Sequence, residues 1–437
     1  MTTYNETIPP LPEGFREEMA PLLREGLSAF LASYEAPYVR GLRLNPLKPC
    51  RLPEGETDGF VPWEKDGLYL NNDSLLGAGL LHEAGGFYIQ EPSAMAAVAA
   101  LKPQPGETVL DLCAAPGGKS TQIAGRMMGE GLLVSNEIVP NRAAILSRNL
   151  ERMGVANALV VNSDPPTLAR LWPGAFDAVL VDAPCSGEGM FRRHPETRTE
   201  WTTASPIGCA QRQLEILNEA AKMVRPGGRL TYSTCTLNSE EDENTAEKFL
   251  AAHPDFEPLP FTLPGVAPMA PNMTKLWPHL IRGEGHFVAC FCRLEGDGKT
   301  TERGTVLPAP DKALLSAFAK VAPKGVSAPN GMLGGKAVLV PPLLPVRGLR
   351  VLRAGLQLGE IRGNIFTPDH AWAMTLPPFP RVELTGDEGM KWLHGETIDT
   401  SSDVSGWCVA TYDGLPLGFG KISGGQMKNH YPKGLRK

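Results

Sequence analysis

The chain has 437 residues, of which 42% are hydrophobic and 21% charged, and this composition is typical of a globular protein with two to four domains. No apolar run approaches the roughly 20 residues of a membrane span, residues 1–12 lack the features of a secretory signal, and eight cysteines are too sparse for a disulfide scaffold. We therefore expect a cytoplasmic protein with free thiols, no membrane association and no metal. The net charge of −6 argues weakly against a nucleic acid as binding partner.

The first predicted module is small and mixed. Residues 13–34 carry apolar side chains three and four positions apart, which predicts one amphipathic helix. Residues 41–47 and 67–71 are predicted to form short strands among prolines and glycines. We assign these elements to an N-terminal α+β module, residues 1–85.

Strand and helix patterns alternate through residues 86–295. The predicted strands are residues 107–112, 132–136, 158–161, 177–181 and 229–233, and the predicted helices are residues 119–128, 141–153 and 211–223. Ser239 and Asp242 resemble a capping box that opens a further helix, and residues 273–280 and 286–293 predict an antiparallel pair. Apolar strands interleaved with helices indicate an α/β domain whose parallel sheet is covered on both faces.

Beyond a linker at residues 294–305, short strand-like runs suggest one or two β-rich modules, which we divide into residues 296–366 and 367–437. Charge is unevenly distributed there. Residues 301–366 hold nine Lys or Arg and three acids, and residues 421–437 hold five Lys or Arg and no acid. Such segregation can create a basic face on an acidic protein.

A loop of small residues follows the first strand of the α/β domain, from Asp111 to Lys119. It matches neither the dinucleotide-binding glycine pattern nor a P-loop, so a polyphosphate is not the expected ligand. Acids end the successive strands at Asp111, Glu137, Asp164 and Asp182, where open α/β sheets bind ligands. Glu137 could accept from ribose hydroxyls and Asp164 from an adenine amino group. These features fit S-adenosylmethionine, an adenosine that has no phosphates and carries positive charge.

Two cysteine motifs follow the fourth and fifth predicted strands. They are Asp182-Ala183-Pro184-Cys185-Ser186-Gly187 and Ser233-Thr234-Cys235-Thr236. A thiolate that adds to C6 of cytosine makes C5 nucleophilic toward an activated methyl group. A carboxyl group near N3 would stabilise the charge that develops, and Lys119 would help to lower the pKa of the thiol. Spacing alone leaves open which cysteine attacks, since DNA cytosine methyltransferases use a Pro-Cys thiol.

These motifs, with Asp111-Leu112-Cys113-Ala114-Ala115-Pro116-Gly117-Gly118-Lys119-Ser120, resemble the Nol/Nop/Sun family of RNA cytosine-C5 methyltransferases over residues 86–295. The resemblance implies a Rossmann-like class I S-adenosylmethionine-dependent core. It implies that Cys235 is the nucleophile, that Cys185 assists product release, and that Asp182 and Lys119 also touch the base. The implied cosubstrate site consists of Cys113, Ala114, Ala115, Pro116, Gly117, Gly118, Lys119, Glu137, Arg142, Asp164 and Asp182.

The flanking segments also resemble parts of this family. Gly14-Phe15-Arg16 and residues 43–48 look like its N-terminal accessory RNA-binding module, and residues 407–437 look like a PUA-like RNA-binding module. The length and the C-terminal extension resemble the bacterial 16S rRNA enzymes of the RsmF type. The resemblance thus implies 16S rRNA or the small ribosomal subunit as partner, and we expect a monomer.

RNA contacts are predicted at two places. Phe191, Arg192 and Arg193 could hold the RNA backbone or stack on a base beside a flipped cytosine. A basic stretch would bind phosphates independently of sequence; it comprises Lys336, Arg347, Arg350, Arg353 and Arg362. The alternatives left open are the same chemistry on tRNA, a DNA modifier that uses Cys185, and a non-catalytic RNA-binding factor in ribosome assembly.

Overall fold

The computed structural model describes residues 8–437. Residues 1–12 were interpreted above as lacking a secretory signal, and the first seven of them lie outside the described residues. Within the described part of the chain the largest sheet has nine strands, in the order β10-β12-β9-β8-β5-β6-β7-β15 with β11 on β12. These strands are β5 (Thr108–Asp111), β6 (Leu132–Asn136), β7 (Ala158–Asn162), β8 (Phe176–Asp182), β9 (Val224–Thr234), β10 (Phe256–Pro258), β11 (Met273–Leu276), β12 (His286–Arg293) and β15 (Arg350–Ala354).

The centre of this sheet is parallel, and its edges are antiparallel. Strands β7, β6, β5, β8 and β9 pair in parallel, whereas β12 pairs antiparallel with β9 and β15 antiparallel with β7. Parallel strands bring their carboxyl ends to one edge, which is where the sequence places its acids and thiols.

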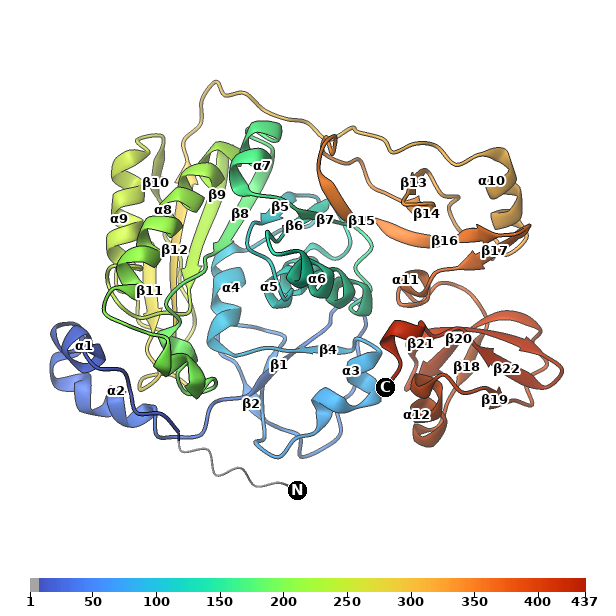
Figure 1. Ribbon diagram of the computed structural model, residues 1–437, viewed down its shortest axis with the longest axis horizontal. Coiled ribbons are helices and arrows are strands. Elements are labelled where there is room, and N and C mark those ends of the chain that lie inside the picture. Colours follow the sequence, from blue (N-terminus) through green and yellow to red (C-terminus); the bar gives the residue numbers. More distant parts are fainter. Residues whose placement is uncertain (1–7) are drawn as a thin grey trace.

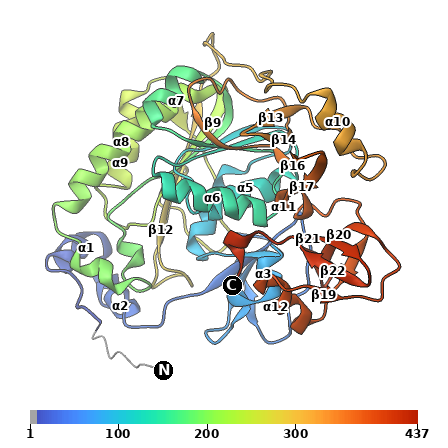
Figure 2. The same ribbon diagram turned by 45° about the vertical axis from the view of Figure 1, so that its right-hand side comes forward.

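Helices cover both faces of the sheet, as Figures 1 and 2 show. Neighbouring residues of one strand enter different cores, because successive side chains point to opposite faces: Leu110 packs in a core with Leu217 of α8, and Val109 in a core with Ile123 of α5. The helices of this domain are α4 (Ala96–Leu101), α5 (Gly118–Met127), α6 (Pro140–Arg152), α7 (Pro165–Leu171), α8 (Ser205–Met223) and α9 (Glu243–Ala252). The predicted Rossmann-like α/β fold is confirmed.

The start of α9 differs from the prediction. Asp242 precedes the helix, but its side chain makes no capping hydrogen bond. Instead its carboxylate accepts from Thr234 Oγ1 at 2.6 Å and lies 3.0 Å from Lys275 Nζ. The predicted capping box is therefore wrong, because a buried ion pair with β11 takes the carboxylate that would have capped the helix.

The N-terminal part combines two helices with a four-stranded sheet in the order β2-β3-β1-β4. Its elements are α1 (Phe15–Leu23), α2 (Leu27–Ser33), β1 (Gly41–Leu44), β2 (Thr57–Phe60), β3 (Gly67–Leu70), α3 (Leu80–Glu83) and β4 (Phe87–Ile89). The single helix predicted for residues 13–34 is interrupted at Arg24, whose φ of 47° cannot continue a right-handed helix.

Two small sheets form the C-terminal part, in the orders β13-β14-β16-β17 and β18-β20-β21-β22-β19. The first region contains α10 (Lys312–Ala319), β13 (Gly331–Leu333), β14 (Lys336–Leu339), β16 (Leu356–Arg362), β17 (Ile365–Pro368) and α11 (His370–Ala373). The second contains β18 (Arg381–Glu383), α12 (Gly386–His394), β19 (Ile398–Asp399), β20 (Gly406–Tyr412), β21 (Leu415–Ser423) and β22 (Gln426–Asn429). The β-rich character predicted for this region is confirmed, and the segment assigned to 296–366 also supplies β15 to the central sheet.

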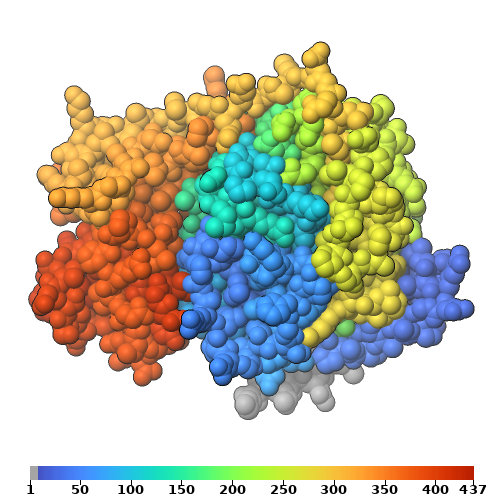
Figure 3. Space-filling model, turned by 180° about the vertical axis from the view of Figure 1, so that it is seen from behind, coloured from blue at the N-terminus to red at the C-terminus, as the bar shows by residue number. Residues whose placement is uncertain are grey.

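The two ends of the molecule share one hydrophobic core. Leu42 and Phe87 of the N-terminal sheet are buried with Trp392 of α12 and Leu415 of β21. Figure 3 shows from behind that the blue N-terminal residues lie directly against the red C-terminal ones. Along residues 8–437, no helix combines the length and apolar character that crossing a membrane would need.

Candidate active site

A hollow of about 460 Å³ opens at the carboxyl ends of β5, β8 and β9. Its walls come from the small-residue loop, from β4 and the residues that follow it, from the segment after the first thiol motif and from the start of β12. The lining residues are Tyr88, Ile89, Gln90, Glu91, Ala94, Asp111, Cys113, Ala114, Ala115, Pro116, Gly118, Lys119, Arg142, Asp182, Met190, Arg193, His194, Cys235, Glu284, Gly285 and His286.

The small-residue loop forms one wall because β5 ends at Asp111 and α5 begins at Gly118. Gly117 turns the chain into the helix with a φ of 113°, a conformation that favours glycine. The Asp111 carboxylate has one bonded oxygen and one free oxygen. Its Oδ2 accepts from Ser120 Oγ at 2.6 Å, whereas its Oδ1 is buried and has no hydrogen-bond partner among residues 8–437. Burial raises the pKa of Asp111 to about 7. A cationic ligand in the hollow would satisfy this oxygen, which fits the positively charged methionine part of S-adenosylmethionine.

Two further acids predicted for the cosubstrate, Glu137 and Asp164, follow the ends of β6 and β7. The Glu137 carboxylate accepts from Val139 N at 2.8 Å and lies 3.7 Å from Arg142 Nη2. Asp164 caps α7 by accepting from Thr167 N at 2.9 Å, and this hydrogen bond lowers the pKa of Asp164. Within the described chain neither acid, nor Gly117, belongs to the lining of the hollow.

Asp182 and Lys119 form an ion pair inside the hollow. Lys119 Nζ donates to Asp182 Oδ2 at 2.7 Å, and Ser233 Oγ donates to Asp182 Oδ1 at 2.8 Å. Burial alone would raise the pKa of Asp182, but the neighbouring Lys119 and His286 together outweigh burial and hold that pKa well below its usual value. The site therefore presents a carboxylate and an ammonium side by side.

The two motif cysteines meet, because their strands are parallel neighbours with Asp182 beside Ser233. Their Sγ atoms lie 3.3 Å apart. Cys235 belongs to the lining of the hollow, and Cys185 does not within residues 8–437. The hydrogen bond with Cys235 and burial raise the pKa of Cys185 well above its usual value, so Cys185 carries its proton at neutral pH.

Buried hydrogen bonds fix the loops that carry the thiols. Glu241 accepts from Ser186 N at 3.0 Å and from Gln213 Nε2 at 2.8 Å, which ties the first thiol loop to the second. Gly189 N donates to Cys235 O at 2.9 Å, and a Cβ on Gly189 would lie 2.8 Å from that oxygen. These contacts hold the backbone of the two loops that carry the thiols.

The predicted RNA contacts after the first thiol motif need correction. Phe191 is fully buried among Phe15, Tyr34 and Trp201. Arg192 is bound to Glu284 by an ion pair of 2.7 Å. Neither side chain can therefore stack on a base or hold a phosphate, because both are used to attach the N-terminal helices. Arg193 does line the hollow.

The predicted basic stretch is also partly engaged within the protein. Arg353 is 2% exposed and paired with Glu151, so it cannot bind phosphate. Lys336 pairs with Asp369 at 2.6 Å, and Arg362 with Glu360 at 2.7 Å. Arg347 and Arg350 are exposed.

Several lining residues were not identified from the sequence. Tyr88, Gln90 and Glu91 come from the N-terminal side, and His286 is the first residue of β12. Only His286 carried a usable signal, as a histidine at the end of a strand predicted to join the sheet. The others reach the hollow through the packing of the N-terminal sheet on the α/β domain.

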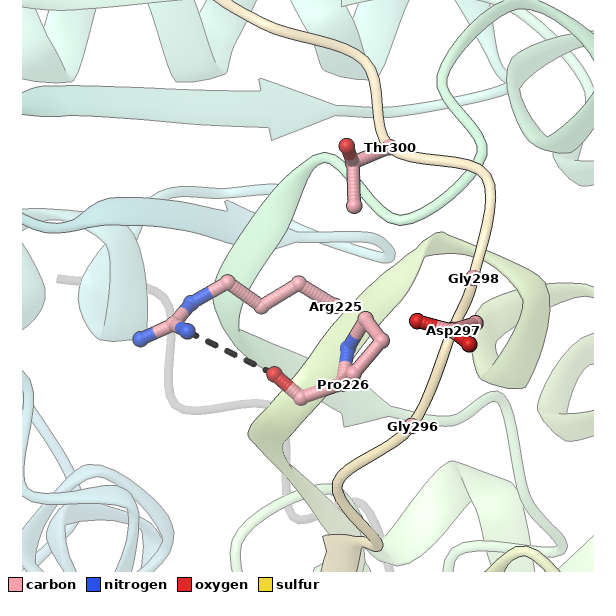
Figure 4. A pocket seen from close by; sticks show the side chains of 6 residues that line it. All are labelled: Arg225, Pro226, Gly296, Asp297, Gly298 and Thr300. Carbon is pink, nitrogen blue, oxygen red and sulfur yellow. Dashed lines mark hydrogen bonds between the residues drawn. The ribbon is translucent and has the colours of Figure 1, made fainter.

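A second hollow lies at the opposite end of β9 from Cys235. It is lined by Arg225, Pro226, Gly296, Asp297, Gly298 and Thr300. Figure 4 shows Arg225 turned back toward its neighbour, with Nη1 donating to Pro226 O at 3.4 Å, while the linker runs past. With neither a thiol nor a histidine among these lining residues, it is not a candidate for the methylation chemistry.

Comparison with protein families matches four successive segments of the chain. Residues 11–92 match the N-terminal domain of 16S rRNA methyltransferase RsmF, and residues 98–292 match 16S rRNA methyltransferase RsmB/F. Residues 329–376 match the RsmF rRNA methyltransferase first C-terminal domain, and residues 379–437 match the methyltransferase RsmF PUA domain.

Individual proteins are similar over most of the chain. Ribosomal RNA small subunit methyltransferase F of Klebsiella pneumoniae (strain 342) is 32% identical, over 97% of this chain and 96% of its own length. A methyltransferase homolog protein from Pyrococcus horikoshii superposes with a TM-score of 0.56 at 29% identity, over 65% of this chain and 100% of its own. The structure of NSun6 from Pyrococcus horikoshii with SFG, at 21% identity and a TM-score of 0.56 over 65% of this chain and 99% of its own, shares the fold.

Proposed function

Because this chain belongs to the RsmF group of S-adenosylmethionine-dependent rRNA methyltransferases, we propose that it forms 5-methylcytosine in 16S rRNA through a covalent bond between Cys235 and C6 of the cytosine. One observation carries this proposal. Cys235 lines the same hollow as the small-residue loop and as the ion pair of Asp182 with Lys119. A thiol, an acid and a cosubstrate cradle thus converge on one space.

The cradle holds the methyl donor in this proposal. S-adenosylmethionine supplies an electrophilic methyl group when it is bound. The buried Asp111 oxygen and the start of α5 border the hollow and suit its charged part. Glu137 and Asp164 lie at the next strand ends. We assign Glu137 to the ribose and Asp164 to the adenine, with Arg142 beside Glu137.

The two thiols then have separate tasks. Cys235 adds to C6, and Asp182 and Lys119 stabilise the charge at N3 and its neighbouring carbonyl. Cys185 keeps its proton because of its raised pKa, so its S–H can donate to Cys235 when the carbon–sulfur bond breaks. This division supports Cys235 as the nucleophile, which spacing alone could not decide.

RNA must present an unpaired or flipped cytosine to this hollow, because C5 and C6 are covered inside a helix. Arg193 lines the hollow, and exposed cations lie on the C-terminal part at Arg347 and Arg350. Phosphate contacts of this kind make binding salt-sensitive. The free thiols suit a reducing cytoplasm, where we propose that the protein acts as a monomer.

Tritiated methyl transfer tests the proposal. The purified chain is given S-adenosylmethionine with naked 16S rRNA, with small ribosomal subunits lacking the modification, with tRNA and with DNA. We expect incorporation into 16S rRNA or the small subunit, located by bisulfite mapping to cytosine. Transfer to tRNA alone would replace the substrate, and no transfer to any nucleic acid would favour a non-catalytic assembly factor.

A further inference from the structure

His286 is a buried histidine that the mechanism above does not use. It is the first residue of β12, and the next residue, Phe287, pairs with Thr234 at the end of β9. Continued by one residue, this antiparallel register places His286 opposite Cys235, which directly follows the end of β9, and both residues line the same hollow. The side chain is 2% exposed and lines the hollow.

The imidazole has free capacity for hydrogen bonding. Among residues 8–437, neither of its ring nitrogens has a hydrogen-bond partner. Its Nε2 lies 3.6 Å from Asp182 Oδ1, just beyond hydrogen-bond distance. Buried polar groups in folded proteins are almost always paired, so an unpaired buried imidazole that faces a ligand space points to a partner supplied during the reaction.

The acids and the lysine around the hollow are already engaged. Glu91 accepts from Ser93 N and from Glu284 N, each at 2.9 Å. Glu284 is paired with Arg192. Lys119 is paired with Asp182, and Asp111 accepts from Ser120. Of the remaining lining residues, His194 lies 3.1 Å from Glu196, and Arg142 and Arg193 cannot relay a proton because a guanidinium stays charged in proteins. Asp182 and the Cys235 thiol are therefore the groups with which His286 can exchange a proton.

We propose that His286 relays the proton of the Cys235 thiol to Asp182 and thence to N3 of the cytosine. This inference rests on the proposed cytosine-C5 methylation. Burial and the Lys119 ammonium lower the pKa of His286, so the imidazole is neutral at pH 7 and ready to accept.

The relay balances atoms and charge. The S–H bond of Cys235 breaks and one imidazole nitrogen gains that proton, while the other nitrogen gives a proton to Asp182 Oδ1. The sulfur bonds to C6, the C5–C6 electron pair shifts toward N3, and N3 takes the proton from Asp182. When the carbon–sulfur bond later breaks, Cys185 S–H protonates the leaving Cys235 sulfur, and the N3 proton returns through Asp182 and His286 to the Cys185 thiolate, which restores both thiols. The C5 hydrogen leaves separately, to water.

The test separates the first half of the reaction from the second. In 16S rRNA transcribed with 5-fluorocytidine, the fluorine at C5 blocks elimination, so the methylated covalent adduct accumulates and its rate of formation reports attack and methyl transfer alone. We expect His286→Gln to slow adduct formation by about 100-fold, within the range of general acid–base catalysis. The variant rate should rise by about tenfold per pH unit from pH 6 to 8, since the thiolate must then form by losing its proton to solvent.

Controls make the outcome decisive. His253→Gln alters a half-buried histidine that is bonded to Asn218, outside the lining of the hollow, and should keep wild-type rates. Thermal melting and S-adenosylmethionine binding establish that His286→Gln is folded, and His286→Asn is made in parallel as a second variant without a titrating group.

Wild-type adduct formation by a folded His286 variant would overturn the relay, and slow release of an ordinary cytosine adduct would then assign His286 to removal of the C5 hydrogen. Failure of the wild-type protein to form any adduct would instead contradict the proposed function itself.

Discussion

At the residue scale, environment distinguishes two cysteines that the sequence presents alike. Both follow parallel strands, and their sulfur atoms lie 3.3 Å apart. Cys235 faces the hollow, whereas Cys185 lies behind it with a raised pKa. A protonated thiol beside a sulfur leaving group is placed to assist product release.

We expect Cys235→Ala to abolish both methyl transfer and covalent RNA adducts, because the motif thiol that lines the hollow and is proposed to attack C6 is then absent. Cys185→Ala should instead leave the protein bound to RNA, visible as a slow band on a denaturing gel, since release is impaired after attack. Cys209→Ala is the control, because Cys209 is a partly buried cysteine of α8 that is not among the lining residues of the hollow. Retained activity in Cys235→Ala, or no trapped band in Cys185→Ala, would contradict these roles.

A second residue-scale prediction concerns the cost of burying Asp111. Its pKa is about 7 in the folded protein and near 4 in the unfolded chain, so the folded state binds more protons between those values. The wild type without cosubstrate therefore loses stability as pH rises from 4 to 7. Asp111→Asn removes that loss, so the difference in free energy of unfolding between this variant and the wild type should rise by about 2.5 kcal/mol from pH 5 to pH 8.

Urea unfolding at several pH values measures this difference, and equilibrium dialysis should show weaker S-adenosylmethionine binding by Asp111→Asn. The control Asp58→Asn alters a carboxylate that is 66% exposed and should follow the wild type at every pH. A stability difference that does not change with pH would show that Asp111 is not titrating as described.

At the element scale, the two antiparallel edges of the sheet have different effects. Strand β12 brings His286 into the lining of the hollow that also contains Cys235. Strand β15 covers the other edge, at β7, and its Arg353 is paired with Glu151 of α6. Covering an edge strand removes unpaired backbone groups that could otherwise recruit another chain.

We expect Arg353→Ala to lower the free energy of unfolding by about 3 kcal/mol, because Glu151 is left as a largely buried charge without its partner. Chemical denaturation measures the loss. Arg350→Ala on the same strand is the matched control, since Arg350 is exposed and its nearest polar contact, Asn162 Oδ1, lies at 3.4 Å. Equal stability of the two variants would contradict the structural role of Arg353.

At the scale of the whole molecule, the N-terminal and C-terminal sheets close against one another beside the α/β domain. Leu80 of α3 and Trp392 of α12 lie in their shared core. The last residue, Lys437, lies 3.0 Å from Glu83 of α3. Modules that match separate family domains are thus joined by a common hydrophobic interface, which limits their motion relative to each other.

Gly389 tests this interface, because a Cβ there would lie 2.6 Å from Leu80 Cδ1. We expect Gly389→Leu to destabilise the protein by about 1–3 kcal/mol, as overpacked cores do. Gly386→Leu, in the same helix with open space around it, is the control and reports the helix-forming preference alone. Calorimetry of both variants decides: an unchanged melting temperature for Gly389→Leu would show that the two ends do not depend on this contact.

By itself, the sequence determined the α/β sheet, the small-residue loop and the ends of strands at which the thiols lie. These features follow from local periodicity and from the rule that parallel strands gather their carboxyl ends at one edge. The family of the chain was evident from the same motifs, because they are short and contiguous.

Only the tertiary structure decided which cysteine faces the hollow, and that His286 lines the same hollow as Cys235 from a strand some fifty residues later in the chain. It also decided that Arg192 and Arg353 are buried ion-pair partners and that Asp242 is not a cap. The physical reason is the same in each case. Whether a charged or polar side chain is exposed, paired or aimed at a ligand depends on segments that are distant in the sequence, and no local pattern records their approach.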